Sequence, residues 1–232
     1  MKILTIPDLH EKDIWKKAIS KDWDKVIFLG DYVDSFDHDK DKCISNLLDI
    51  IEFKKSNPDN IILLLGNHDI QYLDSKYRCS GYQQDSAALI TIILNDNKGL
   101  FKVAYLHKNY LFTHAGISKK WFNSFRVENS DIYSKSIPLD VLFNDIHNSS
   151  RQEILHTVSY IRGGSHLYGG ITWADKQETM EGIIPNYHQI VGHSKVPEII
   201  KASKIMGTTY KDRSITYTDC LDTKEEFLIL DI

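Results

Sequence analysis

Several apolar runs in this chain stop abruptly at side chains that can bind metals or move protons. The runs Lys2–Ile6, Lys25–Leu29 and Ile61–Leu65 are followed by Asp8 and His10, by Asp31 and Asp34, and by Asn67, His68 and Asp69, respectively. Two later runs end in His114 and His193. Carboxylates and imidazoles are costly to bury unless a cation compensates their charge. The pattern therefore indicates polar groups that converge on bound metal.

The elements around these groups explain how they could converge. Each run has the length of a strand, and uninterrupted apolar residues suit strands that are covered on both faces. The segments 11–21 and 42–55 show the apolar spacing of helices. Alternating strands and helices are typical of parallel strands, whose carboxyl ends meet at one edge of a sheet. We therefore expect the polar clusters to lie together at that edge.

The donor atoms define the kind of metal site. Oxygen and imidazole ligands without sulfur suit Mn, Fe or Zn, with Mg less favoured. The candidate ligands form two sets that share one carboxylate: Asp8, His10 and Asp31 for one ion, and Asp31, Asn67, His114 and His193 for a second. A bridging Asp31 would bring two ions to about 4 Å, the spacing of hydrolytic sites in which a hydroxide between the ions attacks the substrate.

The order of these motifs resembles the calcineurin-like metallophosphoesterase superfamily. Within it, the chain is similar to the phosphoprotein-phosphatase branch, which includes small bacterial and phage enzymes and symmetrical diadenosine-tetraphosphate hydrolases. The motifs that carry the resemblance over nearly the whole chain are Asp8-Leu9-His10, Gly30–Asp34, Gly66–Asp69, Thr113–Gly116, Thr172–Asp175 and Val191–Ser194. The resemblance implies an α/β fold: a metallophosphoesterase-type β-sandwich flanked by helices, with the metal site at the carboxyl ends of the strands.

The same resemblance implies roles for the remaining polar residues. His68 would act as general acid and protonate the leaving-group oxygen, and Asp34 would orient it; a His paired with a carboxylate is a good acid near neutral pH. Asp69 would orient a ligand imidazole. The cofactors would be two divalent ions, with manganese preferred and Fe, Zn, Ni or Mg as alternatives.

Two departures from the family pattern concern the substrate. Protein phosphatases of this branch carry Arg-Gly where this chain has Ser35-Phe36. Either another arginine binds the phosphate or the substrate is less highly charged. Arg162 is the first candidate and Arg78 the second. The motif ending Gly192–Lys195 also lacks the second histidine that many phosphodiesterase branches carry, which argues against a dedicated diesterase.

Three functions remain open from the sequence. The preferred one is a metal-dependent phosphoesterase that acts either as a phosphomonoesterase of the Ser/Thr protein phosphatase type or as a dinucleoside polyphosphate hydrolase. The alternative is a phosphodiesterase for cyclic nucleotides or RNA ends. A non-catalytic binding module is disfavoured because every ligand position and His68 are intact.

The length and net charge of the chain predict its domain organisation and exclude some classes of partner. The 232 residues suit a single metallophosphoesterase domain, 1–232, with a helical insertion at about 118–162. A net charge of −4 disfavours nucleic acid as a partner beyond a substrate end.

Three scattered cysteines fit a reducing compartment. Without a signal peptide or a transmembrane run, we expect a cytoplasmic protein that contacts no membrane. Richness in Lys, Ile, Asn and Asp suggests an AT-rich bacterial or viral genome.

Two further groups of residues are interpreted as structural. The loop Gly163–Gly170 matches no phosphate-binding fingerprint. It is interpreted as a plain loop, although Ser165, His166 or Tyr168 could contact substrate. The other histidines are interpreted as surface or structural residues: His38, His107, His147, His156 and His188.

Overall fold

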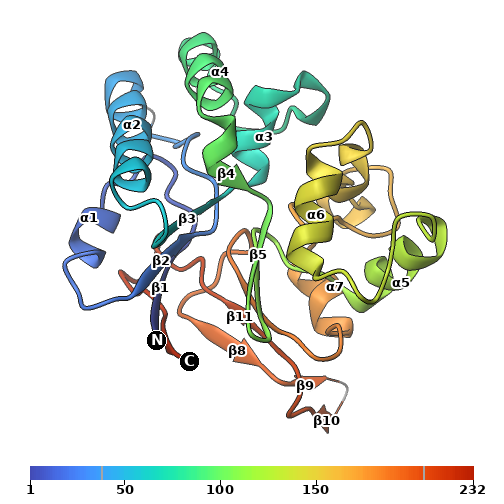
Figure 1. The fold of residues 1–232 in the computed structure, drawn as a ribbon. Coiled ribbons are helices and arrows are strands. Elements are labelled where there is room, and N and C mark those ends of the chain that lie inside the picture. Colours follow the sequence, from blue (N-terminus) through green and yellow to red (C-terminus); the bar gives the residue numbers. More distant parts are fainter. Residues whose placement is uncertain (38, 206) are drawn as a thin grey trace.

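Two five-stranded sheets form the centre of the molecule in the computed structural model, which describes residues 1–37, 39–205 and 207–232 (Figure 1). The first sheet has the order β12-β1-β2-β3-β4. Its strands are β1 (Lys2–Ile6), β2 (Lys25–Phe28), β3 (Ile61–Leu64), β4 (Phe101–Lys102) and β12 (Ile229–Asp231). Strands β1 to β4 are parallel, and only β12 runs antiparallel to its neighbour in this sheet. The carboxyl ends of β1, β2 and β3 therefore meet at one edge, as expected from the sequence.

The second sheet brings the two later histidine motifs to the same place. Its order is β5-β6-β7-β11-β8, with strands β5 (Ala104–His107), β6 (Tyr110–Thr113), β7 (His188–Val191), β8 (Ile200–Ala202) and β11 (Ser214–Tyr217). Strands β6, β7 and β11 are parallel to one another. Strands β9 (Lys204–Ile205) and β10 (Thr208–Thr209) form a separate ribbon.

The interface between the sheets is apolar. Ile27 and Leu64 of the first sheet belong to one buried cluster with Phe112 of β6 and Ile190 of β7. Burying such side chains fixes the two sheets against each other, at about 1.5–3 kcal/mol for each large residue. The strand ends that carry the polar motifs are thus held on a rigid base.

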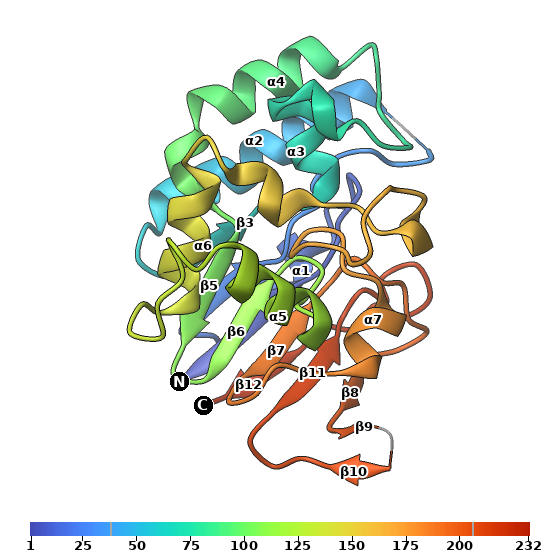
Figure 2. The ribbon, with the colours of Figure 1, turned by 90° about the vertical axis from the view of Figure 1, so that its right-hand side faces the viewer.

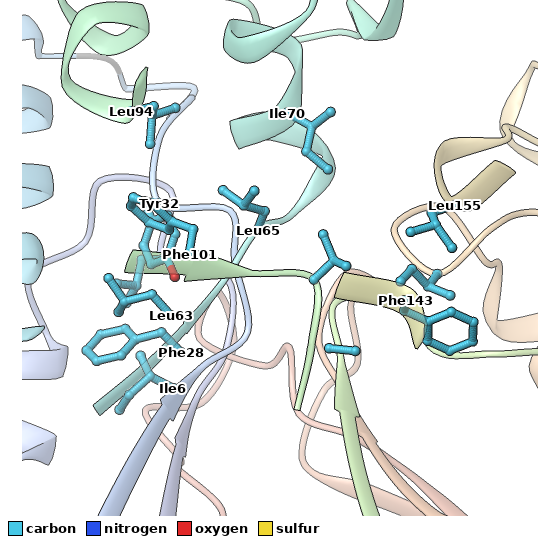
Figure 3. Close-up of a cluster of buried hydrophobic side chains, with 14 of the residues drawn as sticks. Ile6, Phe28, Tyr32, Leu63, Leu65, Ile70, Leu94, Phe101, Phe143 and Leu155 are labelled. Atoms are coloured by element: carbon cyan, nitrogen blue, oxygen red, sulfur yellow. The ribbon is translucent and has the colours of Figure 1, made fainter. Parts of the chain in front are cut away.

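Helices cover the outer faces of both sheets (Figures 1 and 2). The first sheet is accompanied by α1 (Trp15–Ala18), α2 (Lys40–Ser56), α3 (Asn67–Leu73), η1 (Ser75–Tyr77) and α4 (Ala87–Asp96), and η2 (Lys98–Leu100) leads into β4. The second is accompanied by α5 (Lys119–Glu128), α6 (Leu139–His147), η3 (Gln152–His156), η4 (Tyr160–Arg162) and α7 (Lys176–Glu181). The largest core cluster runs from Phe28 and Leu63 in the first sheet to Phe143 and Leu155 beside the second (Figure 3).

The fold differs from the sequence-based expectation in the first helix. The helix expected over 11–21 shortens to α1, because the backbone of residues 9–11 donates instead to carbonyls of Asp31 and Tyr32. Farther along the chain, Val103 separates β4 from β5, and its N–H bonds the Asn144 side chain, so that the two strands join different sheets.

Within the described residues, the longest helices fall short of the length and apolar character that a bilayer crossing requires.

Candidate active site

The loops at the carboxyl ends of the strands adopt unusual backbone conformations. His10, Asp31, Asp34 and His193 all have positive φ, between 43° and 68°. Residues other than glycine rarely adopt this region, which costs of order 1–3 kcal/mol and persists where the surroundings enforce it. The strain is therefore concentrated at the residues that the sequence singles out.

Two glycines allow the backbone to approach these side chains closely. A Cβ atom on Gly66 would lie 2.1 Å from Asp31 Oδ1, and one on Gly192 would lie 2.1 Å from Asp8 Oδ1. No real Cβ tolerates such contacts. The glycines are needed because the carboxylates lie directly against the neighbouring loops.

One set of donor atoms converges on the buried ring of His114. His114 Nδ1 donates to the Leu29 carbonyl at 2.8 Å, which directs Nε2 toward the other donors; in the neutral imidazole Nε2 can bind a metal. Around Nε2 lie Asn67 Oδ1 at 3.0 Å, His193 Nδ1 at 3.1 Å and Asp31 Oδ2 at 3.4 Å. Four electron-pair donors thus meet in one buried place, the arrangement expected around a cation.

A second set of donors adjoins the first. The ligand atoms of Asp8, His10 and Asp31 lie within 4.8 Å of one another. The His10 ring donates through Nδ1 to the Val33 carbonyl at 3.0 Å, which directs Nε2 toward Asp31 Oδ2 at 3.9 Å. The backbone N–H of His193 donates to both Asp8 oxygens, at 2.9 and 3.0 Å, and fixes that carboxylate.

Asp31 stands between the two sets. Its Oδ1 accepts from the backbone N–H of His68 at 2.9 Å, and its Oδ2 faces both His10 and His114. Burial favours the neutral acid, but the positive charges of His114 and His68 prevail and hold the pKa of Asp31 well below its ordinary value. A charged carboxylate at this point can be shared by two cations.

Without metal, the groups around Asp31 have strongly shifted pKa values or lack a hydrogen-bond partner. Burial raises the pKa of Asp8 to about 7. Burial lowers the pKa of His114, but the charges of Asp31 and Asp8 outweigh it and raise the value to about 10. In the part of the chain that the structure describes, the buried Nε2 of His193 has no hydrogen-bond partner. Two divalent ions would satisfy all these groups, so the donor set fits the metals that the sequence implies.

His68 lies beside the two sets rather than within them. Its ring is 5.0 Å from the ring of His10, edge to face. Its Nδ1 lies 2.9 Å from Asp34 Oδ2, and Asp34 also accepts hydrogen bonds from Tyr72 Oη and Gln71 Nε2. Burial lowers the pKa of His68, but the nearby carboxylates Asp31 and Asp34 raise it to about 9. The ring is thus held in place and kept basic, which suits a proton donor.

Asp69 has a different role from the one expected. It is fully buried and accepts the backbone N–H groups of Asp31 at 2.8 Å, Tyr32 at 3.0 Å and Gly66 at 2.8 Å. Both oxygens are therefore used by backbone, and the prediction that Asp69 orients an imidazole is wrong. It instead fixes the two loops that carry Asp31 and Asn67.

The two candidate arginines are placed differently. Arg162 Nε lies 2.7 Å from Asp175 Oδ2, and its Nη2 donates to Ser194 Oγ at 3.0 Å, directly beside His193. Arg78 is exposed and stacks over the Tyr82 ring at 4.1 Å. Arg162 therefore adjoins the metal-ligand candidates through Ser194.

One buried carboxylate was missed by the sequence analysis. Asp219 follows β11 and is only 5% exposed. Burial raises its pKa to about 8, and the negative charges of Asp8 and Asp31 add to that rise. The signal was present, since Asp219 follows a strand-like run in the same way as Asp8 and Asp31. The hydroxyls of Thr216 and Thr218 weakened the apolar pattern of that run.

The remaining histidines lie outside both donor sets, except His38, which is outside the described residues. His107 is partly exposed, His188 Nδ1 bonds Ser214 Oγ at 2.8 Å, and His156 is buried.

A family model and two solved structures are similar to this chain. The model of the family described as calcineurin-like phosphoesterase matches residues 1–197. The structure of the cold-active protein-tyrosine phosphatase of a psychrophilic Shewanella species is similar to the chain, with a TM-score of 0.61 and 16% identity over 99% of this chain and 75% of that one. A point mutant of a cold-active protein tyrosine phosphatase gives a TM-score of 0.62 with the same identity and coverage. At this identity the two structures show a shared fold. No curated protein matches the sequence.

Proposed function

Because the chain belongs to the calcineurin-like phosphoesterase family, it is a metal-dependent hydrolase of phosphate esters, and we propose that it is a two-metal phosphomonoesterase. The observation that carries the proposal is the position of Asp31, whose Oδ2 lies 3.4 Å from His114 Nε2 and 3.9 Å from His10 Nε2. One carboxylate shared by two donor sets is the feature that a pair of ions needs. In this proposal residues 1–232 form one catalytic domain.

We assign each of the two sets of donor atoms to one metal ion. Asp8, His10 and Asp31 would hold the first ion, and Asp31, Asn67, His114 and His193 the second. When bound, the ions would neutralise phosphate charge and lower the pKa of a water nucleophile. Manganese is our preferred metal because oxygen and imidazole donors are mixed. The backbone bonds to His10, Asp8 and His114 fix the donors before any metal arrives.

His68 would donate the proton that the leaving oxygen needs. The hydrogen bond from His68 Nδ1 to Asp34 places its second nitrogen, Nε2, on the opposite edge of the ring. Asp34 is itself held by Tyr72 and Gln71, so the ring cannot turn freely. An imidazole fixed and charged in this way contributes about 10²–10⁴-fold to such reactions.

Arg162 is our candidate for the phosphate-binding cation. Its bond to Ser194, next to His193, supports it over the exposed Arg78. Position 35 has no cation, and the backbone N–H of Ser35 is taken by Glu11 at 3.1 Å. Arg162 Nε lies 2.7 Å from Asp175 Oδ2 and Nη2 donates to Ser194, but a guanidinium group has five N–H donors and can bind a phosphate oxygen as well.

The candidate substrates are phosphoproteins and dinucleoside polyphosphates, with phosphodiesters as the alternative. One relative is named a protein-tyrosine phosphatase, so phosphotyrosine belongs in the panel. The test is hydrolysis with Mn²⁺ of phosphoserine, phosphothreonine and phosphotyrosine peptides, diadenosine tetraphosphate, a cyclic nucleotide and a phosphorylated oligonucleotide. We expect hydrolysis of at least one monoester or polyphosphate that chelation abolishes and Mn²⁺ restores. Activity that survives chelation, or cleavage of the cyclic nucleotide alone, would reject the proposal.

A further inference from the structure

A cleft of about 750 Å³, within the size range of small-molecule sites, opens between η1, α5, η3 and the loop of residues 164–168. We call it the aromatic cleft, because four of its lining side chains are aromatic: Tyr77 of η1, Trp121 and Phe125 of α5, and Tyr168. Trp121 and Phe125 are buried and form stacked rings 5.1 Å apart, whereas Tyr77 and Tyr168 are partly exposed. A flat ring entering the cleft would meet the two tyrosines first.

One wall of the cleft leads to the ligand candidate Asn67. Tyr77 is two residues from Cys79, whose Sγ accepts a hydrogen bond from Asn67 Nδ2 at 3.7 Å. The Cys79 backbone N–H is held in turn by Gln71, a neighbour of Asp34. The wall is thus tied to the residues that hold both metal and proton donor.

The opposite wall leads to His193. His156 lines the cleft, and its Nδ1 lies 3.0 Å from Thr172 Oγ1. The next residue, Trp173, places its ring 5.7 Å from the ring of His193. None of the metal-ligand candidates lines the cleft itself. The cleft is connected to them through the contacts to Asn67 and His193, and it would receive the part of a substrate that extends from the phosphate.

The charges on the cleft disfavour an anionic occupant. Glu128 and Glu153 lie on its exposed part, and its one ammonium group, that of Lys76, is 3.9 Å from Asp74. An additional phosphate or carboxylate would be repelled there. At the buried end, His156 Nε2 has no hydrogen-bond partner among the described residues, a cost that a polar atom of a ligand would remove.

We propose that the aromatic cleft binds an uncharged aromatic ring carried by the leaving group of the substrate. The inference rests on the proposed phosphomonoesterase function and names its substrate class. The ring could be an aryl group close to the phosphate or a nucleobase beyond a ribose. Both offer the same flat, uncharged surface to Tyr77 and Tyr168, and stacking of this kind contributes about 0.5–1.5 kcal/mol for each pair beyond area burial.

The test compares substrates that differ only in the ring. Benzyl phosphate is paired with cyclohexylmethyl phosphate, and adenosine 5′-monophosphate with ribose 5-phosphate. Within each pair the leaving alcohols are of similar reactivity, so kcat/KM reports recognition of the ring. The variants are Tyr77→Leu and Tyr168→Leu, which remain apolar. The control is Tyr160→Leu, because Tyr160 is 65% exposed and does not line the cleft.

We expect the Mn²⁺ enzyme to favour the aromatic member of at least one pair by about 3- to 10-fold in kcat/KM. Each cleft variant should lower that preference toward unity while still hydrolysing the non-aromatic member, which shows that the variant is folded. Tyr160→Leu should keep the wild-type preference. The pair that shows the preference tells whether the cleft binds an aryl group close to the phosphate or a nucleobase. Equal hydrolysis within both pairs by the wild type, or a preference that survives both cleft substitutions, overturns the inference while leaving the phosphomonoesterase intact. If none of the four esters is hydrolysed by an enzyme that hydrolyses a phosphopeptide or diadenosine tetraphosphate, the inference alone is overturned. Failure on those substrates as well would overturn the proposed function, and the inference with it.

Discussion

Replacing His68 with Asn should separate proton donation from metal binding. The backbone N–H of residue 68 donates to Asp31 Oδ1 at 2.9 Å, and this bond does not depend on the side chain. Asn is also well tolerated in the first turn of a helix, where α3 begins. The substitution should therefore leave both donor sets in place and remove only the imidazole that Asp34 orients.

The loss of kcat in the His68→Asn enzyme should depend on how much the leaving group needs a proton. Loss of a positioned acid should lower kcat by about 10²–10⁴-fold on alkyl phosphates, equivalent to about 2.7–5.5 kcal/mol. On p-nitrophenyl phosphate, whose leaving oxygen departs without a proton, the loss should be at least tenfold smaller. The assay is steady-state hydrolysis with Mn²⁺, with metal content measured on the same samples. Equal losses on both esters with full metal content would refute the role of His68.

The pH profile gives a second readout of the same prediction. Without metal the pKa of His68 is raised to about 9 from an ordinary 6.5, after the charges of Asp31 and Asp34 outweigh burial. Bound cations would compensate Asp31 and leave mainly the effect of Asp34. A general acid works only while protonated, so kcat on an alkyl ester should fall between pH 6.5 and 9. The His68→Asn enzyme should lack that alkaline limb.

Three further predictions address the rest of the site. Arg162→Ala should weaken inhibition by inorganic phosphate about 10- to 100-fold, whereas the control Arg213→Ala should not; an unchanged inhibition constant would favour Arg78. Gly192→Ala should lose metal from the first donor set, since the added Cβ would lie 2.1 Å from Asp8 Oδ1. The control is Gly99→Ala, whose added Cβ would have no atom within 4 Å. Full metal content in both variants would contradict this packing. Burial raises the folded-state pKa of Asp8 to about 7, so the metal-free fold binds more protons than the unfolded chain between about pH 4 and 7. Its denaturation midpoint in chelator should therefore fall from pH 5 to pH 8, and Mn²⁺ should reduce that fall; a midpoint that rises with pH would be inconsistent with it.

The sequence predicted the positions of the parallel strands and the groups at their ends. Continuous apolar runs fixed β1, β2 and β3, and the polar residues after each run lie at one edge because parallel strands share their direction. His114 and His193 could be included for the same reason, since β6 and β7 are also parallel.

What the sequence could not predict depends on contacts between distant segments. The short length of α1 follows from backbone bonds between residues 9–11 and the loop after β2, which no local pattern reveals. The role of Asp69 follows from three N–H groups that meet only after the two loops pack. The aromatic cleft joins Tyr77 with Tyr168, which are far apart in the sequence.

The central claim is that two cations share Asp31, and anomalous diffraction at the manganese edge from crystals grown with Mn²⁺ tests it most directly. The account predicts two peaks about 4 Å apart, one bound by Asp8 and His10, the other by His114 and His193, with Asp31 touching both. A single peak, or peaks bound elsewhere on the chain, would contradict it.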